Sequence, residues 1–196
     1  NTTSVISKGR RAYIEAHTMK TNFETCTFME AQLFHEGKKI ESFPTETKEE
    51  TWVGHSYSHK VKKGETFSLH KYGGYTVSTN HKTNELMKVA DSMMSQATNM
   101  GFDALLDIQK KAWDSIWQMS DITIEGDVRA QQGIRFNIFQ LNQTYLGKDS
   151  RLNIGPKGFK GEIYVGSTYW DTVAYCIPFY MATKDHLVSR NLLQYR

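Results

Sequence analysis

The segment Asn80-His81-Lys82-Thr83 divides the chain into two parts with different sequence patterns. Before it, short runs rich in β-forming residues alternate with turns that contain glycine or lysine. After it, apolar residues recur at helical spacing, and Thr83 or Asn84 can cap the first helix. Because strands come first and helices follow without strands among them, the order predicts an α+β architecture with separate β and α layers or domains.

The first part is expected to contain several antiparallel strands with short connections, as in a β-sandwich or a portion of one. Residues 36–39 supply a turn between two alternating runs, which predicts a hairpin there. The predicted strands cover residues 11–17, 25–34, 40–43, 52–59, 66–72 and 75–79.

The second part is expected to contain helices joined by short connections. Gly101 is the predicted C-terminal cap of the first helix, and the short break after it predicts a helical hairpin. Asp127 is a good N-cap, and Pro178 predicts a kink in the helix that contains it. The predicted helices cover residues 84–100, 105–117, 127–147, 168–182 and a last helix that begins at 183–185.

Composition and charge exclude several classes of protein. The chain has 196 residues, of which 39% are hydrophobic and 23% charged, as expected for a soluble globular protein of one large or two small domains. No apolar run is long enough to cross a membrane, and residues 1–4 show no signal-peptide pattern. The net charge of +3, without a dense Lys/Arg stripe, argues against nucleic acid as a partner. Cys26 and Cys176 are expected to be free and buried, as in a reducing cytoplasm, with a disulfide as the alternative.

A glycine-rich stretch, residues 153–169, leads into the pair Trp170-Asp171. Its glycines and Pro156 favour a loop over a helix. An aromatic face can pack on the C–H groups of a sugar, and a carboxylate accepts hydrogen bonds from its hydroxyls. The chemistry of Trp170 and Asp171 therefore predicts a site for a polar ligand such as a sugar, with helix capping by Asp171 as an equally supported alternative.

Other candidate motifs have simpler explanations. His55 and His59 fall in a strand-like segment without a third ligand nearby, so neither a metal site nor a cofactor is predicted. The glycine-rich stretch lacks the Lys-Ser ending of a phosphate-binding loop and does not follow a strand. Trp113 and Trp117, at helical spacing, are expected to pack in a core.

The run from residue 120 to 183 resembles glycoside hydrolase family 65. The resemblance is carried by SDITIEGD (120–127), QQGIRFNIFQL (131–141), NIGPKGF (153–159), GSTYWDT (166–172) and AYCIPFY (174–180). It implies that residues 1–80 are the C-terminal part of an N-terminal β-sandwich domain and that residues 81–124 are a helical linker. Residues 125–196 would then be the first helices of an incomplete (α/α)6 catalytic barrel.

The resemblance implies an inverting disaccharide phosphorylase, in which phosphate is a co-substrate and a glutamic acid protonates the departing oxygen. The expected reaction converts maltose and phosphate to β-D-glucose 1-phosphate and glucose; phosphorolysis of trehalose, kojibiose or nigerose is the alternative within the family. Asp171 would accept hydrogen bonds from glucose hydroxyls, and Trp170 would shape that pocket. A non-catalytic carbohydrate-binding or structural module is the alternative of another class.

The sequence departs from the family pattern in two respects. The acidic-tyrosine motif with the catalytic glutamate and the phosphate-binding segment, both expected downstream of the Trp-Asp pair, do not occur. This chain is therefore expected to be an internal fragment that has no catalytic residue and is inactive alone, from a cytoplasmic, homo-oligomeric parent. In addition, Val173 stands where the family reads glutamate in Trp-Asp-Thr-Glu.

Overall fold

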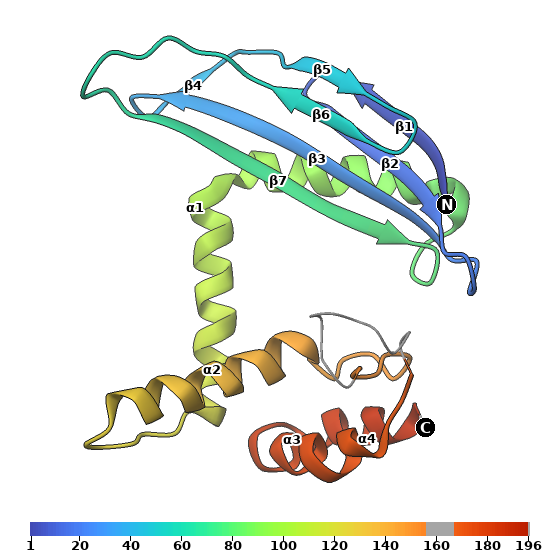
Figure 1. Cartoon of the computed structure of the whole chain (residues 1–196), viewed down its shortest axis with the longest axis vertical. Helices are drawn as coiled ribbons and strands as arrows, with labels where there is room; N and C mark the ends of the chain where they lie inside the picture. The colour runs from blue at the N-terminus through green and yellow to red at the C-terminus, as the bar shows by residue number, and fades with distance from the viewer. Residues whose placement is uncertain (156–166, 196) are drawn as a thin grey trace. The chain divides into compact units, whose positions relative to one another are not determined.

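The computed structural model describes residues 1–155 and 167–195, and the chain divides into two compact units, residues 1–107 and 108–196. Along the chain all seven strands of the described residues come first, and helices follow them (Figure 1). The strands are β1 (Thr2–Lys8), β2 (Arg11–His17), β3 (Glu24–His35), β4 (Lys38–Ile40), β5 (Thr45–Lys48), β6 (Val53–Ser56) and β7 (Phe67–Val77). The helices are a 3-10 turn (Thr83–Glu85), α1 (Leu86–Ser120), α2 (Val128–Thr144), a π-turn (Thr172–Cys176), α3 (Ile177–Thr183) and α4 (His186–Gln194). The predicted order of strands before helices is confirmed.

The first unit is built on a five-stranded antiparallel sheet. Its order is β1-β2-β3-β4, and β7 also pairs with β3, while β5 and β6 form a separate two-stranded ribbon. The predicted hairpin at residues 36–39 is confirmed as the β3–β4 pair, with Glu36 and Gly37 at positive φ in its turn. The strands β1 and β5 were not predicted.

One long strand, β7, replaces two predicted strands. It runs unbroken through Gly73 and Gly74 and pairs with β3 from Thr25↔Val77 to His35↔Phe67. A Cβ at Gly74 would lie 3.0 Å from the Phe28 ring, so the missing side chain makes room for that ring. The glycines interrupt the sequence pattern without interrupting the hydrogen-bonded ladder, and the prediction of a break there is wrong.

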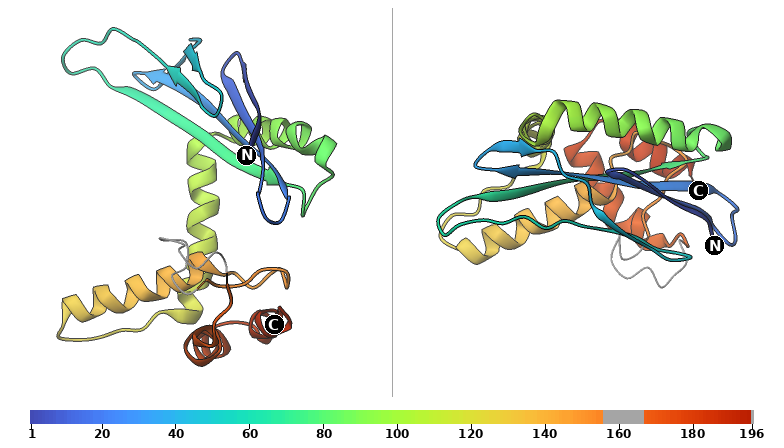
Figure 2. Two further views of the ribbon diagram at one scale, coloured as in Figure 1. Left: turned by 45° about the vertical axis from the view of Figure 1, so that its right-hand side comes forward. Right: turned by 90° about the horizontal axis from the view of Figure 1, so that it is seen from above.

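The core of the first unit lies between the sheet and the first part of α1. Alternation along each strand sends Tyr13, Phe28 and Tyr72 toward Ala90 and Met94 of the helix. Figure 2 shows this part of the helix running along one face of the sheet. A smaller cluster places Val53 of the ribbon against Val5 and Ala12 of the sheet.

A polar network also ties α1 to the sheet. The Arg11 guanidinium donates to the buried Glu30 carboxylate at 2.7 Å and to the Asp91 carboxylate at 2.5 Å. The Tyr13 hydroxyl donates to the same Asp91 oxygen at 2.7 Å. Burial, followed by the bond to Asp91, raises the pKa of Tyr13 to about 12, whereas the bonds from Tyr13 and Arg11 lower the pKa of Asp91. The buried Glu30 charge is thus paired, as burial of a carboxylate requires.

The predicted helical hairpin at Gly101 is wrong. Gly101 has a positive φ of 80° and an extended ψ of 168°, which interrupts the helix, and helix resumes directly after it. Residues 86–120, labelled α1, are thus two helical segments that meet in a kink at Gly101, as the predicted helix end there requires, without the connecting loop that a hairpin needs.

Two helices of the second unit, α2 and α4, begin with a side-chain cap. Asp127 accepts hydrogen bonds from the first backbone N–H groups of α2, and Asp185 does the same for α4, so both predicted starts are confirmed. The core of this unit contains Tyr145, Ile154, Ile177, Tyr180, Val188 and Leu192. The Tyr180 hydroxyl donates to the Leu141 carbonyl at 2.8 Å and so links α3 to α2.

Both cysteines are free thiols, as predicted. Cys26 is fully buried in the first unit, and burial raises the pKa of its thiol to about 11. Cys176 lies in the π-turn and is half-buried.

Candidate functional site

The pair Trp170-Asp171 lies in the first turn of a helix that widens immediately into a π-turn. The backbone N–H of Ile177 donates to the Thr172 carbonyl, five residues earlier, where an α-helix would use a four-residue step. Pro178 explains the widening, because its ring has no N–H to donate and would collide with the carbonyl four residues before it. Where a kink was predicted at Pro178, the structure has a π-turn directly before the proline.

Trp170 is exposed and has an aromatic neighbour that was not predicted. Its side chain is 65% exposed and that of Tyr175 is 69% exposed. The two ring centroids lie 5.9 Å apart with the planes tilted by 48°. Sequence spacing alone did not pair these rings; the signal that could have done so is the proline three residues after Tyr175.

Asp171 does not cap the helix. Its backbone is helical, with φ −52° and ψ −39°, and its side chain makes no capping hydrogen bond. The capping alternative for Asp171 is therefore wrong. Burial raises the pKa of the Cys176 thiol, and the negative charge of Asp171 raises it further. The Asp171 side chain is half-buried.

The neighbours of the pair differ in burial. Thr172 is buried, and its hydroxyl donates to the Ile154 carbonyl at 3.4 Å, which ties this turn to the segment before the glycine-rich stretch. Val173 is exposed. Both polar atoms of the Asn153 side-chain amide are buried without a partner among the described residues. Residues 156–166, where a loop is predicted, lie outside the described part of the chain.

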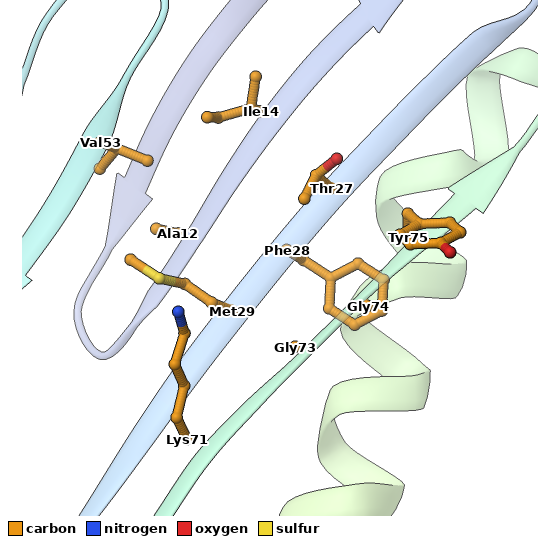
Figure 3. A pocket seen from close by; sticks show the side chains of 10 residues that line it. All are labelled: Ala12, Ile14, Thr27, Phe28, Met29, Val53, Lys71, Gly73, Gly74 and Tyr75. Atoms are coloured by element: carbon orange, nitrogen blue, oxygen red, sulfur yellow. The ribbon is translucent and has the colours of Figure 1, made fainter. Parts of the chain in front are cut away.

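Two hollows lined entirely by described residues do not include Trp170 or Asp171. A hollow of about 330 Å³ on the sheet of the first unit is lined by Ile14, Met29, Lys71 and Tyr75 among others (Figure 3). A cavity of about 530 Å³ in the second unit is lined by Trp113, Asn142 and Lys184 among others. Burial lowers the pKa of Lys184.

The remaining candidate residues have structural surroundings. The His55 ring lies 2.9 Å from the Ser7 hydroxyl, and His59 lies 3.3 Å from His35. Within residues 1–155 and 167–195, no three His, Cys, Asp or Glu side chains are placed to hold a metal ion. The half-buried Trp113 stacks on Phe139 with 5.0 Å between centroids, which agrees with the packing role predicted for it.

The helices do not have the character of membrane spans. None of those in residues 1–155 and 167–195 has both the length and the apolar composition that crossing a bilayer requires.

Two domain families match successive parts of the chain. Residues 1–116 match the glycosyl hydrolase family 65 N-terminal domain, and residues 135–196 match the glycosyl hydrolase family 65 central catalytic domain. Trp170 and Asp171 fall within the second match.

Individual relatives agree with the domain matches. A maltose phosphorylase of Bacillus subtilis (strain 168) is 44% identical over 161 residues, which cover 82% of this chain and 20% of the relative. An alpha,alpha-trehalose phosphorylase of Thermoanaerobacter brockii is 33% identical over 189 residues, covering 96% of this chain and 24% of the relative. This chain therefore spans between a fifth and a quarter of the length of these relatives.

A solved structure gives the same result for the fold. The structure of a candidate kojibiose phosphorylase from the human microbiome matches with a TM-score of 0.84 and 27% identity, covering 100% of this chain and 25% of its own. The predicted fold class, a β-sandwich portion followed by the start of a helical barrel, is confirmed by this match. With its two domains matched in order and relatives of this similarity, the chain belongs to glycoside hydrolase family 65.

Proposed function

We propose that this chain is part of an inverting disaccharide phosphorylase and that Trp170 and Asp171 help to hold the glucosyl unit of its substrate. The observation that carries the proposal is an exposed tryptophan beside a carboxylate that caps no helix. Both residues lie within the match to the central catalytic domain. The related phosphorylases of maltose and of trehalose support the same class of reaction.

The chemistry of the pair suits a sugar. Hydrogen bonds from hydroxyls to an ionised carboxylate are stronger than those to a neutral acceptor, and the ring offers a flat surface to C–H groups. Binding energy gathered on hydroxyls that do not react can orient and distort the ring at the carbon that does. Phosphate is then the attacking co-substrate, no cofactor is required, and a glutamic acid elsewhere in the parent protein supplies the proton.

Maltose is the proposed substrate, because the maltose phosphorylase relative is 44% identical and the trehalose phosphorylase relative 33%. Trehalose, kojibiose and nigerose are the alternatives. We propose a homo-oligomeric parent in the cytoplasm; the free Cys26 and Cys176 agree with a reducing compartment.

The test of the site uses the full-length protein with maltose, trehalose, kojibiose and nigerose, each with phosphate. Asp171→Asn is expected to lower kcat/KM for the preferred disaccharide roughly 10- to 150-fold, the range for a hydrogen bond to a charged group, with little change in KM for phosphate. Asp114→Asn, an exposed carboxylate on α1, is the matched control. Unchanged kcat/KM in Asp171→Asn and Trp170→Ala would refute the proposed site.

A second experiment tests the isolated chain. We expect that incubation with maltose and phosphate releases no glucose 1-phosphate, because the proposal places the acid and the phosphate site elsewhere in the parent. Titration with glucose and maltose then separates the alternatives, since a carbohydrate-binding module should bind sugar alone and a partial active site should not. Release of glucose 1-phosphate above background by the pure chain would contradict the proposal.

A further inference from the structure

We propose that Tyr175 joins Trp170 in a two-ring platform for the glucosyl ring, and that the π-turn at Pro178 is what brings these two rings together. The proposal rests on the glucosyl subsite proposed above. It adds Tyr175 as a residue that contacts the sugar, and Pro178 as a positioning residue.

The geometry of the turn explains why residues five apart meet. In an α-helix, residues five apart point about 140° away from each other around the axis. In a π-turn the hydrogen-bonded step is five residues, so residues five apart lie closer to each other around the axis than in an α-helix. The 5.9 Å between the Trp170 and Tyr175 centroids is the result. Asp171 and Cys176, also five apart, are close enough for the carboxylate charge to act on the thiol.

Pro178 is the cause of the wide turn within this sequence. A regular α-helix through this segment would require the residue-178 nitrogen to donate to the residue-174 carbonyl, which proline cannot do. The Ile177 N–H bond to the Thr172 carbonyl shows the wider step immediately before the proline. An alanine at this position would supply the missing N–H donor and remove the ring clash. The narrower α-helix would then become available.

The carboxylate beside the rings suits a sugar better than apolar protein. The Trp170 and Tyr175 side chains are 65% and 69% exposed in this chain. Their ring planes are tilted by 48°, so the two rings together form an open, V-shaped surface. Apolar protein packed over this surface would desolvate the adjacent Asp171 carboxylate without giving it a donor, which is costly. A glucosyl ring supplies C–H groups for the two rings and hydroxyl donors for the carboxylate at the same time.

The experiment measures KM for the disaccharide, KM for phosphate, kcat and melting temperature in the full-length protein. Tyr175→Ala is expected to raise KM for the disaccharide roughly 2- to 12-fold, the range for an aromatic contact, and to leave KM for phosphate unchanged. Tyr175→Phe keeps the ring and should stay within about twofold of the parent protein. Met181→Ala, an exposed residue of α3, is the control and should change neither constant.

Pro178→Ala tests the positioning role. It should raise KM for the disaccharide in the same range, and combining it with Tyr175→Ala should add little, because both changes remove the same ring from the platform. Strictly additive effects, or no effect of Pro178→Ala, would overturn that role. If Pro178→Ala does not fold, the Tyr175→Ala and Tyr175→Phe pair still decides whether the platform exists.

The outcomes separate this inference from the proposed function. Normal KM in Tyr175→Ala, with impaired Trp170→Ala and Asp171→Asn, overturns the platform and leaves the subsite standing. A fall in melting temperature with unchanged KM in Tyr175→Ala shows that the ring packs against protein and also overturns it. If Tyr175→Ala, Trp170→Ala and Asp171→Asn all have normal kcat and KM, both the platform and the proposed glucosyl subsite are refuted.

Discussion

Gly147, just after α2, is a position where one added methyl group is expected to destabilise the second unit. Its φ is 71°, a left-handed value that favours glycine. A Cβ there would lie 2.4 Å from Cγ1 and 2.8 Å from Cα of Val188 in α4. The Gly147 carbonyl also accepts a hydrogen bond from Asn191 Nδ2 at 2.7 Å, so the two segments are held in close contact.

The magnitude follows from two contributions to the free energy of unfolding. A left-handed conformation costs a residue with a Cβ about 1 to 2 kcal/mol. Forcing a methyl group into a packed interior costs about 1 to 3 kcal/mol more. Rotation of the Val188 side chain cannot relieve this clash, because the added Cβ would also lie too close to the Val188 backbone. Gly147→Ala should therefore lose about 2 to 5 kcal/mol.

Urea unfolding followed by tryptophan fluorescence measures this loss. Gly126→Ala is the matched control, because Gly126 also has a left-handed φ, 85°, but a Cβ there meets no atom within 4 Å. The control should lose only the backbone contribution of about 1 to 2 kcal/mol. In a Val188→Ala background, Gly147→Ala should cost less than in the parent chain. Equal losses for the two glycine variants would refute the steric argument.

Three further predictions concern stability. The hydrogen bond from the Tyr13 hydroxyl lowers the folded-state pKa of Asp91. The Asp91 carboxylate therefore stabilises the folded chain at pH values above its unfolded pKa of about 3.9. This stabilisation is lost as the pH falls through the lower, folded-state pKa. Unfolding of Asp91→Asn should thus depend less on pH between about 2 and 5, and an unchanged pH dependence would contradict this. Met94 is 1% exposed, and Met94→Ala should lower the free energy of unfolding in urea by about 2 to 5 kcal/mol. Met93 is 46% exposed, and Met93→Ala should lower it by less than about 0.5 kcal/mol. Similar losses for the two variants would be inconsistent with the place of Met94 in the core. Asp127→Ala removes the cap of α2 and should cost about 0.5 to 2 kcal/mol with reduced helical circular dichroism, whereas an unchanged spectrum and midpoint would argue against the cap.

Some features of this chain could be predicted from the sequence because their causes are local. The caps at Asp127 and Asp185 depend on a side chain and the N–H groups within the next three residues. The change from strands to helices depends on hydrophobic periodicity over a few turns. The family resemblance likewise depends only on the order of residues along the chain, and this order is enough to single out Trp170 and Asp171.

Other features depended on contacts that the sequence pattern does not contain. Strand β7 crosses Gly73-Gly74 because Phe28, about 45 residues earlier, fills the space that their side chains would occupy. The strands β1 and β5 were missed because the pattern of TTSVISK and TETK is mostly polar: β5 is exposed throughout, and β1 contributes only Val5 to a buried cluster.

The Trp170-Asp171 pair shows the same division. The sequence determined which chemical groups are present and left capping and ligand binding equally open for Asp171. Only the three-dimensional structure decided that Asp171 caps nothing and that Tyr175 lies beside Trp170. The physical reason is that a proline in the sequence shows only that one backbone hydrogen bond cannot form. Whether the chain responds with a break, a kink or a π-turn depends on the packing of the surrounding turn, where Thr172 and Ile177 are buried.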